Sequence, residues 1–464
     1  MTVRELCGGC RWRYREHWLS AGLVAAVAFS LNARAQTGIL NPEEATSRHA
    51  QPATKPSQPP AFSISVADLG FAAPGSLYLG ERTTLVSLDF LDENHLLFTF
   101  RVPGLIRRDT SAVGQDSAGA VAEGDERHIR AVLLALPADA VEAEALWTLH
   151  DRAPYLWMLQ DGHFLVRDRD QILKGDTTLE LKPYLRFPGP VLSLELDPSQ
   201  QYFVTNSREP AATQAKAGTV PTPATAAATV ADAAAGGEAK PALQPDMLMR
   251  ILRASDGKVM LFSRVRAPVY LPINQDGYLE QLRGRGREWT LMLNYFSGGS
   301  KTLGQVESGC APALRFVSQQ ELLATGCGTR GGDQLTAVTT DGRKLWQQEA
   351  PATEVWPWIA VAADGSRLAR ETLVLPYEVN ANSPIGTGDI KGQRVRVYDA
   401  ADGKIVLTAP ASPVLDAGGN VAISPSGKRV AIIDGGAIQV YELAAPPAVP
   451  AASQPVAQGE PLKK

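Results

Sequence analysis

The chain is poor in cysteine, histidine and net positive charge. Its 464 residues include 4 cysteines and 6 histidines, and 45 basic against 49 acidic side chains leave a formal net charge of −4. Because attraction to a phosphate backbone needs an excess of positive charge, this balance predicts that nucleic acid is not a partner. No two histidines have the H-x-x-x-H spacing of a helical zinc site, so we predict no metal site and no cofactor.

Standard enzyme motifs are also missing. The sequence contains no G-x-S-x-G elbow and no G-x-G-x-x-G turn between a strand and a helix, and Gly427-Lys428 lacks the flanking residues of a phosphate-binding loop. We therefore assign no catalytic residue from motifs and favour a protein that is not an enzyme. A propeller enzyme would build its site from separated repeats, so an enzyme remains an open alternative.

The first 35 residues resemble an export signal. Arg4 and Arg11 lie in a basic start, Leu19–Leu31 is an apolar stretch, and Ala33-Arg34-Ala35 fits a small-residue cleavage site. The alternative is an uncleaved anchor, but the apolar stretch is shorter than the roughly 20 residues that span a bilayer. No later segment approaches that length. We predict a mature protein that is extracytoplasmic, periplasmic or secreted, and not transmembrane after signal cleavage.

Two cysteines remain in the mature chain. Cys7 and Cys10 form a C-x-x-C inside the predicted signal, whereas Cys310 and Cys327 flank a predicted hairpin. If this hairpin is centred on Ser318-Gln319, the two cysteines lie opposite each other, which predicts a disulfide in an oxidising compartment. The alternative is a pair of reduced, buried cysteines.

A short pattern recurs seven times between Val86 and Leu443: an apolar run, a tight polar turn, a second apolar run and usually a third. Its clearest copy is Val421–Ile433 followed by Ala437–Leu443. Such a unit buries little alone, so its recurrence predicts an all-β, seven-bladed β-propeller over residues 61–443. Without the insertions at 107–127, 208–245 and 371–392, each repeat has about 43 residues, as in WD40-type blades.

Each copy supplies strands a and b of a blade, and a third strand follows. The first two strands and their turn are predicted at Val86–Phe98, Leu156–Val166, Leu192–Val204, Leu271–Leu282, Leu314–Leu323, Ile359–Leu368 and Val421–Ile433. The third strands are predicted at Ile129–Leu136, Leu179–Leu181, Met247–Leu252, Trp289–Leu293, Leu335–Thr339, Arg394–Tyr398 and Ile438–Leu443.

The last repeat ends after its third strand, where Pro446-Pro447 begins a Pro/Ala-rich tail. The alternating segment Phe62–Val66 has no strand partner of its own. We predict that it completes the last blade as its outer strand, which would cover an exposed sheet edge.

Three of the repeats carry a family resemblance. Arg394–Lys404 and Val421–Gly427 resemble WD40 and related bacterial propeller repeats, and Asp341–Trp346 is similar to quinoprotein-type repeats. The Gly-His dipeptide of eukaryotic WD40 blades is absent. The resemblance implies the propeller superfamily and assigns no particular function.

The three insertions all lie between strands b and c of a blade. In a propeller the b–c and d–a connections emerge on one face, which we call the loop face, and the a–b and c–d turns emerge on the other, the turn face. The insertion 208–245 and the tail 444–464 are predicted to be disordered and the linker 36–60 to be flexible, because these segments contain few large apolar residues. We predict a monomeric, noncatalytic scaffold that binds a protein or cell-envelope component through its loop face.

Three charged residues share one position on strand a, the innermost strand. They are Asp89, Glu195 and Arg315, and one interpretation is an ion cluster that lines the axial channel, where a metal or a substrate would bind. The alternative is ordinary interblade charges or solvated charges of the channel. These residues would serve the alternative function, a channel-centred quinoprotein-like oxidoreductase or metal-dependent hydrolase. Trp356-Pro357-Trp358 is either an exposed aromatic platform or packing between blades, and Arg283–Arg287 is predicted to be the b–c turn of the fourth blade.

Overall fold

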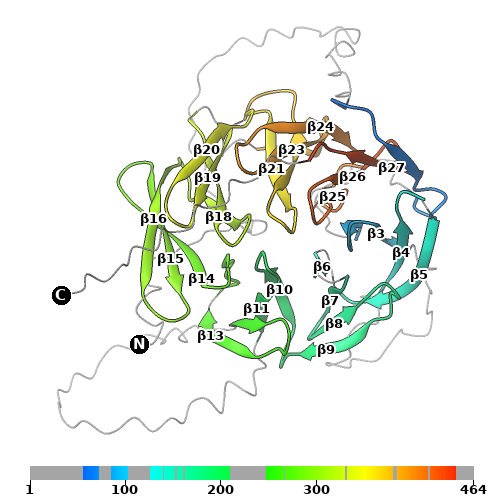
Figure 1. Ribbon diagram of the computed structural model, residues 1–464, viewed down its shortest axis with the longest axis horizontal. Coiled ribbons are helices and arrows are strands. Elements are labelled where there is room, and N and C mark those ends of the chain that lie inside the picture. The colour runs from blue at the N-terminus through cyan, green and yellow to red at the C-terminus, as the bar shows by residue number, and fades with distance from the viewer. Residues whose placement is uncertain are drawn as a thin grey trace, which may run out of the picture. The chain divides into compact units, whose positions relative to one another are not determined.

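The computed structural model is a ring of seven antiparallel β-sheets, a seven-bladed β-propeller (Figure 1). It describes residues 56–72, 85–102, 126–138, 140–151, 154–159, 162–208, 247–265, 267–329, 332–379, 384–415 and 418–445. All of these belong to one compact unit, residues 51–464. The predicted fold class is confirmed.

The strands of each blade follow one another from the axis outwards. Blade 1 contains β2 (Ser87–Phe90), β3 (His95–Val102), β4 (Arg127–Ala135) and β5 (Ala140–Leu149), and blade 2 contains β6 (Leu156–Met158), β7 (Phe164–Asp168), β8 (Gln171–Gly175) and β9 (Lys182–Arg186). Blade 3 contains β10 (Val191–Leu196), β11 (Tyr202–Arg208), β12 (Met247–Arg253) and β13 (Val259–Val265), and blade 4 contains β14 (Gly277–Arg283), β15 (Glu288–Tyr295) and β16 (Ser300–Glu307). Blade 5 contains β17 (Ala313–Phe316), β18 (Glu321–Cys327), β19 (Asp333–Thr339) and β20 (Lys344–Glu349), and blade 6 contains β21 (Glu354–Val361), β22 (Arg367–Val374), β23 (Gly392–Asp399) and β24 (Ile405–Ala411). Blade 7 contains β25 (Val421–Ile423), β26 (Arg429–Asp434), β27 (Ala437–Glu442) and β1 (Phe62–Ser65).

The core lies between the blades, because each sheet buries both of its faces against its neighbours. Between blades 6 and 7, for example, Val395 and Leu407 pack against Ile432 and Tyr441. The sequence permits this arrangement because apolar runs end in tight turns. Gly427 closes the first turn of blade 7 with a φ of 67°, a backbone conformation that costs glycine little.

The first and last parts of the described chain meet in blade 7. β1 pairs antiparallel with β27, with Phe62 opposite Val440, so the outer strand of this blade comes from the N-terminal side (Figure 1). The segment before β1 also reaches blade 6, because the Ser57 amide donates to the Thr408 carbonyl at 2.8 Å. Residues 56–65 therefore join the outer strands of two neighbouring blades.

Blade 4 has three strands, unlike the other six blades. Where strand a would lie, a single β-bridge joins Ile273 to Tyr278. The neighbouring Pro272 has no amide hydrogen to donate, although its carbonyl accepts from the Leu279 amide at 2.9 Å. The first strand predicted in Leu271–Leu282 is thus reduced to one bridge.

Several predicted boundaries were wrong. The third strand of blade 2 is Gln171–Gly175, and Leu179–Leu181 lies in the connection to β9. The hairpin of blade 5 pairs Arg315 with Leu323, so it is centred on Gln319 and the predicted register was wrong by one residue. The long connections are residues 103–126, 209–246 and 375–391, since Glu371 belongs to β22.

Other predictions fall on residues outside the described part of the chain. These are the signal 1–35, most of the linker 36–60, nearly all of the insertion 208–245 and the tail from 446 onwards. Within the described residues, no helix has the length and apolar character needed to cross a membrane.

Candidate functional site

A cavity lies beside the incomplete inner edge of blade 4. Its volume is about 170 Å³, and its walls come from blades 3 to 6. The lining residues include Glu195, Tyr270, Pro272, Ile273, Arg315 and Val361. Most of them lie at the ends of the inner strands or in the a–b turns, which places this axial pocket at the turn-face end of the channel.

Glu195 and Arg315, two of the three charged residues that share a position on strand a, line the same pocket. The Arg315 guanidinium is held by two contacts: its Nη1 donates to the Ile359 carbonyl at 2.9 Å, and it hydrogen-bonds the Tyr270 hydroxyl. Burial raises the pKa of Glu195 above its ordinary value, and the positive charge of Arg315 offsets part of that rise. Two opposite charges therefore face one small cavity.

The turn of blade 5 bridges the gap at blade 4. Gln319 Nε2 donates to Asp197 Oδ2 in blade 3 at 2.9 Å, and Gln319 Oε1 accepts from the Gln275 amide at 2.9 Å. Asn274 Nδ2 donates to the Gln319 carbonyl at 3.1 Å. Gln319 thus connects the a–b turns of blades 3, 4 and 5 beside the pocket.

Asp89 does not join this pair. It pairs with Leu97 in blade 1 and accepts a hydrogen bond from Ser87 Oγ at 2.5 Å. Burial raises the pKa of Asp89 to about 6, and the Ser87 hydrogen bond lowers it in part. Asp89 does not line the axial pocket, since blade 1 is separated in the ring from the blades that carry Glu195 and Arg315.

The loop face carries an exposed tryptophan in an unusual backbone conformation. Trp356, near the start of β21, has a φ of 51° and is 55 % exposed. Positive φ values are rare for bulky residues and cost on the order of 1–3 kcal/mol. Trp358 instead packs against the cluster between blades 6 and 7. In the Trp356-Pro357-Trp358 motif, Trp356 therefore fits the interpretation as an exposed aromatic platform, and Trp358 fits the interpretation as packing between blades.

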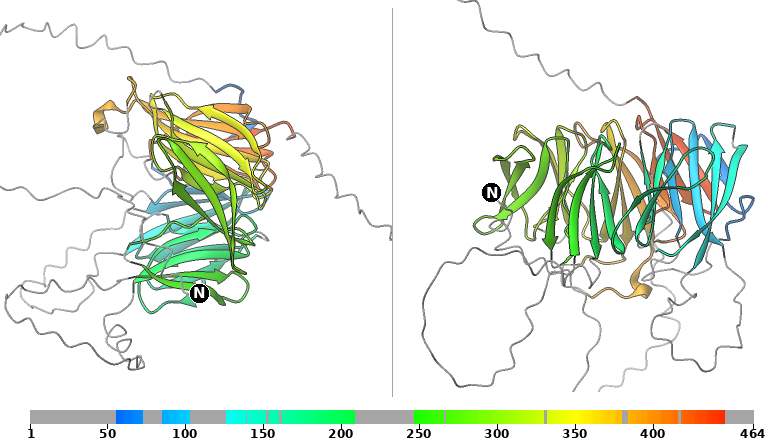
Figure 2. Two further views of the ribbon diagram at one scale, coloured as in Figure 1. Left: turned by 90° about the vertical axis from the view of Figure 1, so that its left-hand side faces the viewer. Right: turned by 90° about the horizontal axis from the view of Figure 1, so that it is seen from below.

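The long connection of blade 6 is anchored near this tryptophan. Leu375 donates its amide to the Thr353 carbonyl at 2.8 Å, and Leu375 and Val379 belong to a buried cluster that also contacts Val355. The exposed Tyr377 lies on this connection, which includes the short helix η4 (Thr387–Asp389) and projects from one face of the ring (Figure 2).

A buried ion network fixes the start of β21. The Glu354 carboxylate is fully buried and accepts from Arg370 at 3.2 Å and from Arg394 at 2.7 Å, and Arg396 makes a third pair. Although burial acts to raise the pKa of Glu354, these three arginines hold it below its ordinary value. The network ties strands a, b and c of blade 6 together directly beside Trp356.

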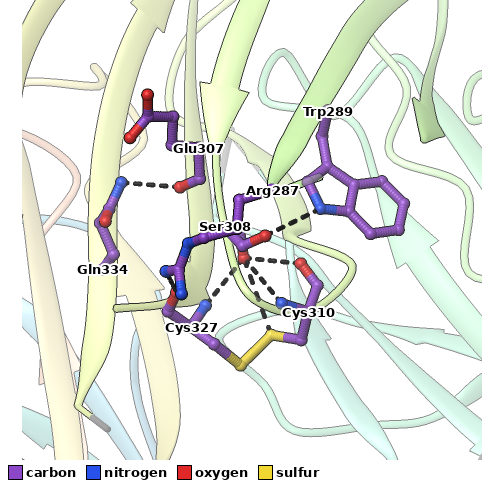
Figure 3. The surroundings of a disulfide bond; sticks show 7 residues. All are labelled: Arg287, Trp289, Glu307, Ser308, Cys310, Cys327 and Gln334. Carbon is purple, nitrogen blue, oxygen red and sulfur yellow. Dashed lines mark hydrogen bonds between the residues drawn. A yellow bond between two sulfur atoms is a disulfide. The ribbon is translucent and has the colours of Figure 1, made fainter. Parts of the chain in front are cut away.

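The predicted disulfide between Cys310 and Cys327 is confirmed, with 5.4 Å between the Cα atoms (Figure 3). It links the connection from blade 4 to the end of β18. Ser308 Oγ contacts the backbone of both cysteines: it donates to the Cys310 carbonyl at 2.6 Å and accepts from the Cys327 amide at 2.9 Å. Arg287, in the b–c turn 284–287 of blade 4 as predicted, donates to the Cys327 carbonyl at 3.0 Å.

Sequence reasoning missed Tyr270 and the Glu354 network. Tyr270 precedes the position where strand a of blade 4 is reduced to one bridge. Its closeness in sequence to Pro272 was the one feature that pointed to it. Glu354 gave none, because its three partners come from two different strands. In the part of the chain that is described, no group of three metal-ligating side chains occurs.

The fold is therefore a seven-bladed β-propeller with a charged axial pocket. No family model matches the sequence, and no curated protein matches it. The chain is similar to an acylaminoacyl peptidase of Pyrococcus horikoshii, with 10% identity, a TM-score of 0.41, and coverage of 75% of this chain and 49% of that one. It thus spans about half the length of these peptidases.

Two smaller propellers give similar values. The C-terminal WD40 domain of Sif2 is 9% identical with a TM-score of 0.36, over 82% of this chain and 97% of that one. TolB from Acinetobacter baumannii is 12% identical with a TM-score of 0.34, over 67% of this chain and 72% of that one. At such identities the likeness concerns the fold alone.

Proposed function

We propose that the protein is an exported, noncatalytic propeller that binds a protein or cell-envelope component through its loop face, as a monomer. The observation that carries this proposal is Trp356, exposed and held at positive φ on that face. Backbone strain at an exposed residue persists where the surroundings enforce it, and it concentrates at binding sites. Large aromatic side chains are also the usual anchors of protein interfaces.

The surroundings of Trp356 suit such an anchor. The Glu354 network makes the start of β21 rigid, so the exposed ring loses little freedom when a partner binds. Three of the seven b–c connections, in blades 1, 3 and 6, are long and leave the ring on this same face. A partner that contacts Trp356 and Tyr377 would lie on this face.

Export is supported by the disulfide, since such bonds persist in oxidising compartments. Sequencing the N-terminus of the protein from the producing cell tests this part. We expect cleavage after Ala35, leaving Gln36 first. A chain that retains Met1 in the cytoplasm would contradict export.

Site-specific photocrosslinking in the producing cell tests the binding face. A photoreactive residue in place of Trp356 or Tyr377 should capture the same partner, whereas one in place of Lys258 or Lys404, on exposed c–d turns of the opposite face, should not. Crosslinks from the turn face alone would contradict the proposal. With the captured partner in hand, Trp356→Ala should weaken binding by tenfold or more while the melting temperature changes little, because the indole ring is more than half exposed and alanine keeps the same backbone conformation.

A further inference from the structure

The axial pocket holds two opposite charges that do not neutralise each other by direct contact. Glu195 and Arg315 form no ion pair, and the Glu195 carboxylate makes no hydrogen bond with any described residue. A carboxylate that faces a cavity and receives no hydrogen bond can still accept one from a ligand. Burying it further without such a partner would cost free energy. The pocket is therefore prepared on one side for a cationic group.

Arg315 prepares the other side. A guanidinium has five N–H donors, and this one uses some of them on the Ile359 carbonyl and the Tyr270 hydroxyl. These contacts fix its orientation and leave other donors for a ligand. An oriented guanidinium is well suited to a carboxylate, because it can donate two parallel hydrogen bonds.

Apolar side chains form part of the walls between the two charges. Pro272, Ile273, Phe316 and Val361 line the pocket. Its volume of about 170 Å³ is more than ten times the roughly 10–15 Å³ that a single water needs. This space accommodates a small organic molecule with a short aliphatic body.

We propose that the axial pocket binds a small zwitterion with an apolar body, of the class of aliphatic α-amino acids, with its ammonium group on Glu195 and its carboxylate on Arg315 and Tyr270. A ligand with only a cation would face Arg315, and one with only an anion would face Glu195. A zwitterion pairs with both charges and leaves neither unpaired. The site is independent of the loop-face function, since it lies at the turn-face end of the channel.

Calorimetric titration of the full chain with three probes of similar shape tests this proposal. L-leucine carries both charges, isopentylamine lacks the carboxylate, and 4-methylpentanoate lacks the ammonium group. We expect L-leucine to bind with a Kd of about 1 mM or tighter and each single-charge probe to bind at least tenfold more weakly. Equal binding of L-leucine and isopentylamine, or no L-leucine heat at about 10 mM, would overturn the proposal.

Variants test the residues assigned to the two ends of the ligand. Glu195→Gln should weaken L-leucine binding at least tenfold, and Tyr270→Phe, which keeps the ring and removes the hydroxyl, should weaken it several-fold. Asp89→Asn is the matched control, because Asp89 holds the same strand position in blade 1 outside the pocket, and it should bind as the wild type does. Circular dichroism melts show whether each variant is folded. Unchanged affinity in a folded Glu195→Gln variant contradicts the assignment.

Discussion

In blades 7 and 4, the consecutive segment of chain supplies only three strands, and the missing strand lies at opposite edges of the two sheets. Blade 7 lacks an outer strand, and β1 takes that place. Blade 4 lacks most of its inner strand, and only the bridge between Ile273 and Tyr278 remains. An outer edge faces solvent, where unpaired strands recruit other chains, whereas an inner edge faces a channel that other chains do not reach. A missing outer strand is thus replaced, while a missing inner strand leaves room for a pocket.

Removing the outer strand of blade 7 should have the largest effect on stability. Deletion of residues 61–66 removes the ladder with β27 and the buried side chains of Ile64 and Val66. Burial of two aliphatic side chains and a strand pairing together contribute on the order of 5 kcal/mol or more. We expect the melting temperature to fall by about 10 °C or more. Ser63→Ala, at an exposed position of the same strand, is the control; an unchanged melt of the deletion variant would show that blade 7 does not need β1.

The boundary between blades 6 and 7 also contains a destabilising residue. Glu371 in β22 is 1 % exposed, and neither of its carboxyl oxygens has a hydrogen-bond partner among the described residues. Burial alone raises the pKa of Glu371 to about 8. The folded protein therefore holds this proton more tightly than the unfolded chain does. The contribution of the protonated Glu371 to the free energy of unfolding is fully present below about pH 4.5 and is lost as the pH rises towards 8.

Glu371→Gln should accordingly stabilise the protein at neutral and higher pH. At pH 7 the ionisable carboxyl costs roughly 3 kcal/mol that an amide of the same shape does not. Denaturant unfolding at pH 5 and pH 8 measures this: the variant should gain over the wild type mainly at pH 8. Glu442→Gln, an exposed carboxylate in the neighbouring blade 7, should change neither curve. A gain of equal size at both pH values would exclude ionisation of Glu371 as the cause.

The disulfide next to blade 4 should contribute a similar free energy of stabilisation. Its cysteines are 17 residues apart, and closing a loop of that length contributes about 3 kcal/mol. We expect the Cys310→Ser, Cys327→Ser double variant to melt several degrees lower than the wild type, as the reduced wild type should. Reductant added to the double variant is the control and should have no effect. A double variant that melts with the oxidised wild type would mean that the hydrogen bonds of Ser308 suffice to hold this connection.

The sequence predicts features that depend on local patterns, and it misses those that depend on how distant blades are placed around the ring. Apolar runs broken by tight polar turns predicted the seven blades, and the shared strand position made Asp89, Glu195 and Arg315 candidates for the channel. The turn after β7 was missed because Arg169, not a glycine, adopts positive φ there, at 55°. Asp89 was grouped with the other charges because strand position does not say which blades lie near each other across the axis.

The smallest effect should come from Gln319, which spans the gap at blade 4. Gln319→Ala removes the hydrogen bonds to Asp197 and to the Gln275 amide, which together contribute about 1–2 kcal/mol. Asp197 keeps its bond from the Tyr202 amide at 2.8 Å, so the turn of blade 3 should stay folded. Gln320→Ala, the exposed neighbour, is the matched control in denaturant unfolding. If both variants lose the same stability, the inner edge of blade 4 is held by packing around Ile273, and the comparison with the closing strand of blade 7 rests on apolar contacts alone.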